Sequence, residues 1–441
     1  MYRTALWLIV TVFMQISVLS QWIQVSGVPG AEIGSYPSIS SPNKNVVVVA
    51  GGNTNSPRVF RSTNGGLNFT NITGNITGAE LYSVCALNAD TIFAGNGGSP
   101  GGVGGNARVY MTTNGGVNWS IAIQTGGNSG FISGISFSKV NPDFGLIVSD
   151  PAIENDSFWV AKTTDRGATW KVVKAPNAAQ YTNQNSIFVV DELFYGFGLH
   201  ASPAKIYLTT NGGISWSVKQ IGLTGNSVPS VAFRSDKLTG IAISDVTYPN
   251  IAITGNGGTN WQAINVGAGN SGIATVKWVP GTPVFYIAAN KIKRSSDNGV
   301  SWFEMSTAGI QNFSHMDLSV ESNELCAYAL ASDGKVLKYS GDPFGIDPSN
   351  TTIPVQYSLE QNFPNPFNPQ TTIKYSIPEP AFVTLKIFDA AGSEVMTVTD
   401  SHHRAGNYYE DIDMTRLSSG IYIYTLYAGG ETISRKMVLL K

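Results

Sequence analysis

The stretch Thr112-Thr-Asn-Gly-Gly-Val-Asn-Trp119 decides the fold of this chain, because five similar stretches occur elsewhere in the sequence. Each copy follows a short apolar segment and ends on an aromatic residue. The other copies are Ser62-Thr-Asn-Gly-Gly-Leu-Asn-Phe69, Thr163-Thr-Asp-Arg-Gly-Ala-Thr-Trp170, Thr209-Thr-Asn-Gly-Gly-Ile-Ser-Trp216, Thr254-Gly-Asn-Gly-Gly-Thr-Asn-Trp261 and Ser295-Ser-Asp-Asn-Gly-Val-Ser-Trp302. A motif that recurs in this way indicates a repeat protein with one structural unit per repeat.

The residue types in each copy predict a turn between two antiparallel strands. The third residue is Asn or Asp, whose side chain can accept hydrogen bonds from nearby backbone N–H groups, and the fifth is Gly, which supplies a positive φ. The Ser or Thr hydroxyl satisfies further donors of the turn, and the closing aromatic residue is expected to pack between sheets. The turn role falls to Asn64, Asn114, Asp165, Asn211, Asn256 and Asp297, and the packing role to Trp119, Trp170, Trp216, Trp261 and Trp302.

These residues resemble the Asp-box, or BNR, motif of sialidases, xyloglucan-active glycosidases, sortilin-type receptors and photosystem II assembly factors. The resemblance covers six copies in register, and it implies a β-propeller in which the box is structural. It does not select among the functions of those families, because a fold of this kind carries many functions.

The spacing of aromatic residues predicts the number of blades. Aromatic residues at positions 22, 69, 119, 170, 216, 261 and 302 are 41 to 51 residues apart, which is the length of one four-stranded blade. Seven such residues predict seven blades. Trp22 begins a strand at 22–25 that has no box before it, and residues 334–339 form a strand with no full box after it. We therefore expect the N-terminal strand to complete the last blade, which removes exposed sheet edges.

The segments outside the repeat predict an exported, all-β protein. Residues 1–20 carry Arg3 and a 15-residue apolar run, and they predict a signal peptide that is cleaved after Ser20. No later segment is apolar enough for a transmembrane helix. We expect a propeller over residues 21–341, a proline-containing linker over 342–356 and a small Ig-like antiparallel β-sandwich over 357–441, with strands around 372–375, 383–388, 420–426 and 433–440.

Four segments of the C-terminal domain carry a second resemblance. They are Asn362-Phe-Pro-Asn-Pro-Phe-Asn-Pro369, Phe388-Asp-Ala-Ala-Gly392, Leu417-Ser-Ser-Gly-Ile-Tyr422 and Lys436-Met-Val-Leu-Leu-Lys441. They resemble the type A C-terminal sorting domain of the type IX secretion system. The resemblance implies that the secretion machinery recognises residues 357–441 and that the protein is secreted or held on the outer-membrane surface. The alternative is an ordinary Ig-like or fibronectin-like accessory module.

Charge and cysteine content exclude several classes of function. Charged residues make up 13% of the chain, and its net charge is −2, so no basic field favours nucleic acid or anionic lipid. Cys85 and Cys326 cannot form a disulfide framework and are interpreted as small buried hydrophobic residues. No spacing typical of metal ligands and no phosphate-binding loop is present, so no metal and no cofactor is expected. The expected ligand is a polysaccharide or a surface protein.

The ligand site is expected at the channel mouth opposite the box turns. Loops before the innermost strands carry Asn128, Asn185, Asn226 and Asn270, and loops between the middle strands carry His200 and Tyr248. Neutral amides and hydroxyls suit sugars or peptide groups, which need many directional hydrogen bonds. The alternative is that these Asn residues only cap turns.

Two carboxylates at the same mouth are weak candidates for catalysis. Asp150 and Asp245 could act as acid and base across a glycosidic bond if their separation allowed it. Ser-Asp pairs that end at Asp150, Asp245 and Asp333 occupy equivalent places in the repeat, which indicates that this Asp is a turn residue encoded by the repeat. Of the arginines that a sialidase would need on this face, only Arg234 is expected there. The sequence therefore favours a secreted or surface-bound binding propeller, and the alternative is a glycoside hydrolase at the channel mouth.

Overall fold

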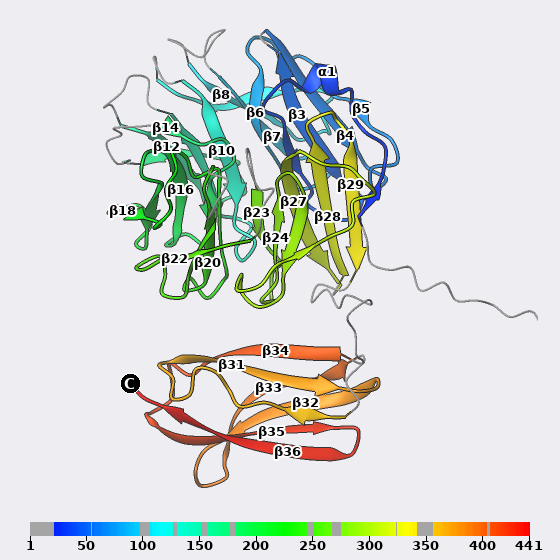
Figure 1. Ribbon diagram of the computed structural model, residues 1–441. Coiled ribbons are helices and arrows are strands. Elements are labelled where there is room, and N and C mark those ends of the chain that lie inside the picture. Colours follow the sequence, from blue (N-terminus) through cyan, green and yellow to red (C-terminus); the bar gives the residue numbers. More distant parts are fainter. Residues whose placement is uncertain are drawn as a thin grey trace, which may run out of the picture.

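The computed structural model describes residues 22–53, 55–97, 106–126, 130–150, 157–173, 175, 181–245, 251–266, 275–322, 324–341, 356–403 and 406–441. This part of the chain is almost entirely β-structure, with one short helix, α1 (Gly30–Ile33). Seven sheets form within residues 22–341, and two more follow residue 356 (Figure 1). The expected all-β fold class is confirmed. The expected signal peptide and residues 342–355 of the expected linker lie outside the described residues.

The first four sheets follow one another along the chain. The first contains β2 (Ser38–Ser40), β3 (Val47–Asn53), β4 (Ser56–Ser62) and β5 (Thr70–Asn71). The second contains β6 (Leu81–Ala86), β7 (Ile92–Asn96), β8 (Arg108–Thr112) and β9 (Ser120–Gln124). The third contains β10 (Ile132–Phe137), β11 (Gly145–Ser149), β12 (Trp159–Thr163) and β13 (Lys171–Val173). The fourth contains β14 (Tyr181–Thr182), β15 (Phe188–Val189), β16 (Tyr195–His200), β17 (Lys205–Thr209) and β18 (Ser217–Gln220).

The last three sheets of this region complete the series. The fifth contains β19 (Ser230–Phe233), β20 (Gly240–Ile243), β21 (Ile251–Thr254) and β22 (Gln262–Ile264). The sixth contains β23 (Thr275–Trp278), β24 (Phe285–Ala288), β25 (Ile292–Ser295) and β26 (Phe303–Glu304). The seventh combines β27 (Phe313–Glu321), β28 (Glu324–Ala331) and β29 (Val336–Gly341) with the N-terminal strand β1 (Ile23–Gln24).

The seven sheets are arranged around a channel. Their innermost strands contact one another in a closed ring, in the order β2, β6, β10, β15, β19, β23, β27 and back to β2. In Figure 1 the last sheet (yellow) accordingly lies beside the first (blue). Sheets that radiate from a closed ring of this kind are the blades of a β-propeller.

The N-terminal strand closes the ring, as predicted. β1 pairs with β29 in antiparallel register, with Ile23 opposite Lys338, and the N–H of Val25 donates to the carbonyl of Val336 at 3.0 Å. Trp22 is 1% exposed and packs against Tyr286 and Tyr339, with ring centroids 6.2 and 5.7 Å away. The first and last parts of the propeller are therefore joined by both backbone pairing and aromatic packing.

The six box turns (62–69, 112–119, 163–170, 209–216, 254–261 and 295–302) join the third and fourth strands of their sheets and share one hydrogen-bond pattern. In 112–119, Oδ1 of Asn114 accepts from the N–H of Asn118 at 3.0 Å, and Oγ1 of Thr112 accepts from the N–H of Gly116 at 2.9 Å. The same two bonds recur in the other five turns. Gly116 has a φ of 90°, and a Cβ there would lie 2.6 Å from Cβ of Ile72, so this position requires glycine.

The box turns are anchored to the turns between the first two strands of the same sheets. The N–H of Gly115 donates to the carbonyl of Asp90 at 3.0 Å, and the five other box turns make the equivalent bond. Both sets of turns therefore lie at one end of the channel, which we call the box-turn end. The loops that enter the innermost strands lie at the opposite end.

The C-terminal domain is a sandwich of two antiparallel sheets. One contains β30 (Ser358–Leu359), β31 (Gln370–Ile377) and β34 (Gly406–Asp413), and the other contains β33 (Glu394–His403), β32 (Ala381–Phe388), β35 (Gly420–Ala428) and β36 (Glu431–Leu439) in that order. Their inner faces enclose a core that includes Ile373, Tyr375, Leu385, Tyr424 and Leu439. β33 and β34 were not predicted from the sequence, because both segments are rich in polar residues.

The Asn- and Pro-rich segment that suggested a sorting domain has a structural role in the sandwich. The N–H of Asn362 donates to the Tyr424 hydroxyl at 2.7 Å, and its Nδ2 donates to Oγ1 of Thr371 at 2.9 Å. Phe367 is 3% exposed, and its N–H donates to the carbonyl of Val438 at 3.0 Å. The segment therefore holds β36 at the edge of its sheet.

Candidate functional site

A cavity of about 500 Å³ occupies the channel, and innermost strands of all seven blades contribute to its wall. Much of this wall is apolar, with Val84, Ile135, Val231, Val276 and Leu318 among its residues. The cavity begins near Asn185 and His315 and extends to the ends of the innermost strands. Its lining there includes exposed residues that belong to the box-turn end, Val140, Pro142 and Glu321. The cavity is therefore reached from the box-turn end.

Charged side chains from three blades meet in this cavity. Lys139 follows β10 and reaches across to β27, where its Nζ lies 3.9 Å from Oδ1 of Asp317 and 3.5 Å from the carbonyl oxygen of Leu318. Oδ2 of Asp317 accepts from the N–H of Ser41 at 2.8 Å, so this carboxylate also ties the last blade to the first. Lys277, on β23, lines the same cavity.

Burial and neighbouring charges act in opposite directions on these groups. Burial raises the pKa of the Asp317 carboxyl, but Lys139, Lys277 and the Ser41 N–H together outweigh this and leave the pKa below its ordinary value. Burial lowers the pKa of Lys277, and the charge of Asp317 opposes this shift. The Asp317 carboxylate is thus ionised and already engaged at neutral pH.

His315 is fixed in one tautomer. Its Nδ1 lies 3.0 Å from the backbone nitrogen of Ile39, which can only donate, so Nδ1 is the acceptor and the proton sits on Nε2. Burial, followed by the charge of Lys277, lowers the pKa of His315 to about 3, so the ring stays neutral. Nε2 is buried and has no hydrogen-bond partner among the described residues. His315 therefore presents an unused donor.

The fourth blade narrows the opposite end of the channel. Its innermost segment is split into β14 and β15, and Nε2 of the intervening Gln184 donates to the carbonyl oxygens of Tyr36 and Tyr82, in the first and second blades. Asn185 has a φ of 58°, and its Oδ1 accepts from Oγ of Ser38 at 3.2 Å. Asn185, an expected ligand residue, thus lines the inner part of the cavity while bonding to another blade.

Of the other expected ligand residues, the two that the structure describes do not line this cavity. Asn128, Asn270 and Tyr248 lie outside the described residues. Asn226 is exposed, and its N–H donates to Oδ1 of Asp245 at 3.0 Å; His200 is exposed at the end of β16. Neither Asn226 nor His200 lines the cavity.

Asp150 is a buried structural carboxylate. It is 8% exposed, and its Oδ1 accepts from the N–H of Thr182 at 2.7 Å, from the Thr182 hydroxyl and from Oγ of Ser133 at 3.2 Å. It thereby joins the third blade to the fourth. Asp245 has a different setting, since its Oδ1 accepts from the N–H of Asn226 within the entry loop of its own blade. Both residues bond to backbone, as turn residues do.

The buried setting of Asp150 predicts a pH-dependent effect of Asp150→Asn. Burial raises the pKa of Asp150 from 3.8 to about 6, so its stabilising contribution is complete below pH 3.8 and is lost as the pH rises through 6. When the pH is lowered from 7 to 4, the free energy of unfolding of the parent should therefore rise by about 2 to 3 kcal/mol relative to that of the variant. Urea denaturation at both pH values measures this shift. A shift of equal size for Asp245→Asn, the matched control, would contradict the role of burial.

Two interpretations of single residues were wrong. Arg234 follows the innermost strand β19 at the box-turn end, where its guanidinium donates to Oδ1 of Asn298 in a box turn at 2.9 Å, so it does not face the opposite mouth. Cys326 is buried, but Cys85 is only partly buried and lines the cavity. Burial raises the pKa of the Cys85 thiol to about 11, so the thiol is protonated at neutral pH.

Lys139, Lys277 and Asp317 were not predicted from the sequence as site residues. A signal was present, since Thr275-Val-Lys-Trp278 and Phe313-Ser-His-Met-Asp317 place charged or ionisable residues inside strands that line the channel. Buried charged side chains are rare without partners. Once the ring of blades is known, charged residues within the innermost strands therefore indicate a candidate functional site.

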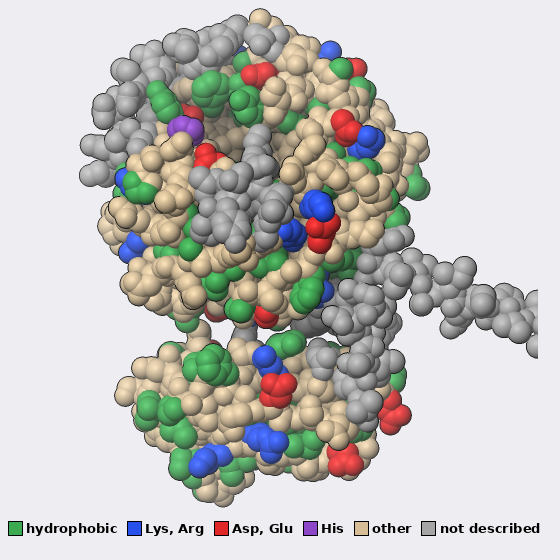
Figure 2. Space-filling model, viewed as in Figure 1, with side chains coloured by type: hydrophobic (Ala, Val, Ile, Leu, Met, Phe, Trp, Pro, Cys, Tyr) green, Lys and Arg blue, Asp and Glu red, His purple; other side chains and the backbone are tan. Residues whose placement is uncertain are grey.

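Neither a metal-binding cluster nor a membrane-spanning helix is found among the described residues. No three His, Cys, Asp or Glu side chains within the described ranges are grouped to hold a metal ion. Among the same residues, no helix has the length and apolar character needed to cross a bilayer. Figure 2 shows charged side chains of both signs scattered over the visible face, without a large patch of one sign.

The fold and its C-terminal module define an exported propeller protein. Residues 361–440 match the family described as the secretion system C-terminal sorting domain. The type IX secretion machinery recognises this domain, so the chain is a secretion cargo that reaches the cell surface or the extracellular space. No curated protein matches the chain.

Solved structures show the propeller fold without close sequence similarity. YCF48 bound to D1 peptide is 15% identical, with a TM-score of 0.50 over 73% of this chain and 97% of that chain. A chain of the mitotic checkpoint complex is 12% identical, with a TM-score of 0.50 over 77% and 100% of the two chains. An α-L-arabinofuranosidase from Fusarium graminearum in complex with an iminosugar inhibitor is 10% identical, with a TM-score of 0.43 over 73% and 97%. At these identities the likeness to the first two structures concerns the fold alone.

Proposed function

We propose that this protein is an exported binding propeller whose ligand is a carbohydrate or a protein segment outside the cell. The observation that carries the proposal is the channel cavity of about 500 Å³, which combines apolar walls with polar groups from several blades. Ligand sites of proteins have this size and this mixture of surfaces. The similar propeller YCF48 is bound to a peptide, which makes a peptide ligand a reasonable choice for a propeller of this fold.

A glycoside hydrolase is the second candidate, and Asp150 is the observation in its favour. A carboxyl group with a pKa of about 6 has the proton affinity that a general acid needs. However, three hydrogen bonds to Oδ1 of Asp150 hold its carboxylate between two blades. Asp245, the expected partner, bonds to the backbone of its own blade. Binding is therefore the better-supported function.

Export depends on the C-terminal domain in this proposal. Deletion of residues 357–441 should leave the propeller in the periplasm, on the inner side of the outer membrane, because the sorting domain would be missing. Protease accessibility of intact cells and fractionation of the medium measure this outcome. A reporter that carries a signal peptide and residues 342–441 is the matched control and should reach the surface. Surface exposure of the truncated chain at the level of the full chain would contradict the proposal.

The binding proposal is tested with the purified full chain on glycan and peptide arrays. Reproducible binding to a defined class of glycan or peptide supports the proposal. Absence of binding on both arrays, with a thermal melt that shows a folded protein, would count against it.

A further inference from the structure

Polar groups without a hydrogen-bond partner occur on residues that line the channel cavity. Nε2–H of His315, 5% exposed, and Oγ of Ser319, 7% exposed, have no hydrogen-bond partner among the described residues, and both residues line the cavity. Lys277 makes no hydrogen bond or close ion pair within the described part of the chain. A donor without a partner is costly, so Lys277, which is only partly buried, favours a ligand that supplies an acceptor.

The carboxylate of Asp317, an acceptor in the inner part of the cavity, is already used. Oδ2 of Asp317 accepts from the N–H of Ser41 at 2.8 Å and from Oγ of Ser40 at 3.4 Å, and Oδ1 faces Lys139. Lys139 is the close partner of Asp317 and is exposed toward the mouth, with 49% of its side chain accessible, so Lys277 is the lysine of the cavity without a close partner of opposite charge. Glu321 is the remaining charged residue of the lining, and it is exposed at the rim. The inner part of the cavity therefore suits a single negative charge.

We propose that the channel cavity binds the carboxylate of a small organic acid, with Lys277 and Lys139 beside the carboxylate, His315 in the adjoining wall and the apolar residues around the body of the acid. This inference rests on the proposed binding function and names the chemistry of the bound group. A free acid or the end of a larger ligand presents the same carboxylate. The side chains of this binding pocket belong to different blades, so the pocket exists only when the ring is closed.

Several features favour a monocarboxylate over other acceptor-rich groups. A neutral sugar would leave Lys277 without a close counter-ion, since Asp317 acts on it only at longer range, in a setting where burial already disfavours its charge. Phosphate carries more negative charge than Lys277, the lysine without a close partner, can offset, and the carboxylate of Glu321 at the rim repels it more strongly than a monocarboxylate. The apolar residues Val84, Ile135 and Val276 in the wall favour a hydrocarbon body next to the carboxylate.

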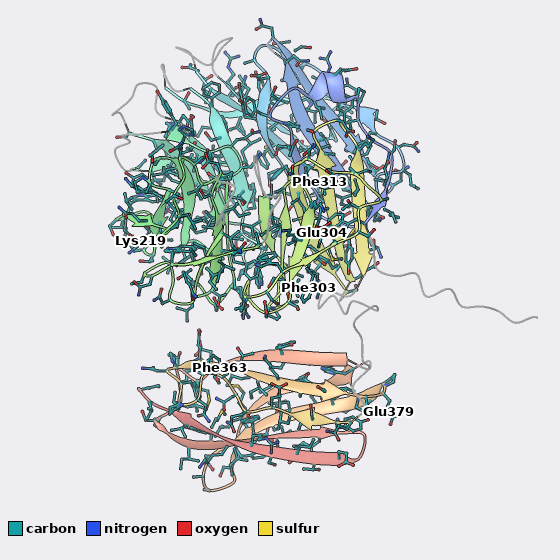
Figure 3. The ribbon with its side chains drawn as sticks, in the orientation of Figure 1. Lys219, Phe303, Glu304, Phe313, Phe363 and Glu379 are labelled. Atoms are coloured by element: carbon teal, nitrogen blue, oxygen red, sulfur yellow. The ribbon has the colours of Figure 1, made fainter. Side chains whose placement is uncertain are left out.

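Calorimetric titration of the full chain tests the inference. Hexanoate and phenylacetate are the carboxylate probes, hexanamide is the neutral counterpart, and inorganic phosphate is the competing anion. The carboxylates should bind, and hexanamide and phosphate should bind at least tenfold more weakly. Lys277→Met should weaken hexanoate binding at least tenfold, because it removes a charged donor, and Lys277→Arg should retain most of the binding. Lys219→Met is the matched control, since Lys219 lies on β18 at the edge of the propeller (Figure 3), and it should bind as the parent does.

A second readout separates direct binding from an effect on folding. In the protein with 15N-labelled histidine, the Nε2–H resonance of His315 should shift on addition of hexanoate and stay in place with hexanamide. Equal binding of hexanamide, preferential binding of phosphate, unchanged affinity of a folded Lys277→Met variant or no binding of any carboxylate would each overturn the inference. Array binding that survives in Lys277→Met would leave the proposed function standing while this inference fails.

Discussion

Replacement of Trp22 by alanine is expected to lower the free energy of unfolding by about 3 to 5 kcal/mol, which is the usual loss for a large aromatic side chain in a core. Trp22 is 1% exposed and packs against Tyr286 and Tyr339 of the last two blades. Its Nε1 makes no hydrogen bond among the described residues, so the loss comes from packing. Urea denaturation followed by tryptophan fluorescence or circular dichroism measures it.

Ile23→Ala is the matched control for Trp22→Ala. Ile23 is the next residue, is 50% exposed, and keeps its backbone pairing with Lys338 in either variant. We expect this control to change stability by less than about 1 kcal/mol. Equal losses for both variants would contradict the role of Trp22 burial in closing the ring.

Replacement of Asp317 by alanine is the other change with a large expected effect. It should lower the free energy of unfolding by about 3 to 5 kcal/mol, because it leaves Lys139 and Lys277 without their counter-ion. It also leaves the N–H of Ser41 without its acceptor. In the parent, this stabilisation is complete above the unfolded-state pKa of 3.8 and is lost as the pH falls toward the lower pKa of the folded state.

Two further variants identify the source of the Asp317 effect. Asp317→Asn keeps an acceptor for the Ser41 N–H, so it should cost less than Asp317→Ala. Asp333→Ala removes an exposed carboxylate that pairs with Lys335 and should change stability by less than about 1 kcal/mol, as exposed ion pairs do. A loss for Asp317→Ala no larger than that for Asp333→Ala would contradict the buried network.

The elements that could be predicted from sequence are those encoded locally and repeated. The pattern from Thr112 to Trp119 fixes a turn by bonds within eight residues, and its recurrence indicated a propeller before the ring was known. Closure of the ring by the N-terminal strand was also predictable, because Trp22 begins a strand that no box precedes. The strands β33 and β34 were missed since their residues, such as those in Gly406–Asp413, lack a clear apolar alternation.

The candidate site was harder to predict because it depends on contacts between blades. The side chain of Lys139 meets Asp317, which lies 178 positions later in the chain, only after the ring has closed. Nothing local marks Gln184 as the residue that spans the opposite end of the channel. Asp150 and Asp245 looked equivalent in sequence, yet their burial and partners differ.

The central claim, that the propeller binds its ligand without converting it, is tested most directly by measuring binding and product release on the same sample. The full chain is incubated with a glycan or peptide to which it binds, and bound ligand is quantified together with released reducing ends or cleaved peptide. The account predicts saturable binding with the ligand recovered intact. Release of product that Asp150→Asn or Asp245→Asn abolishes, while binding persists, would contradict the account and establish a hydrolase.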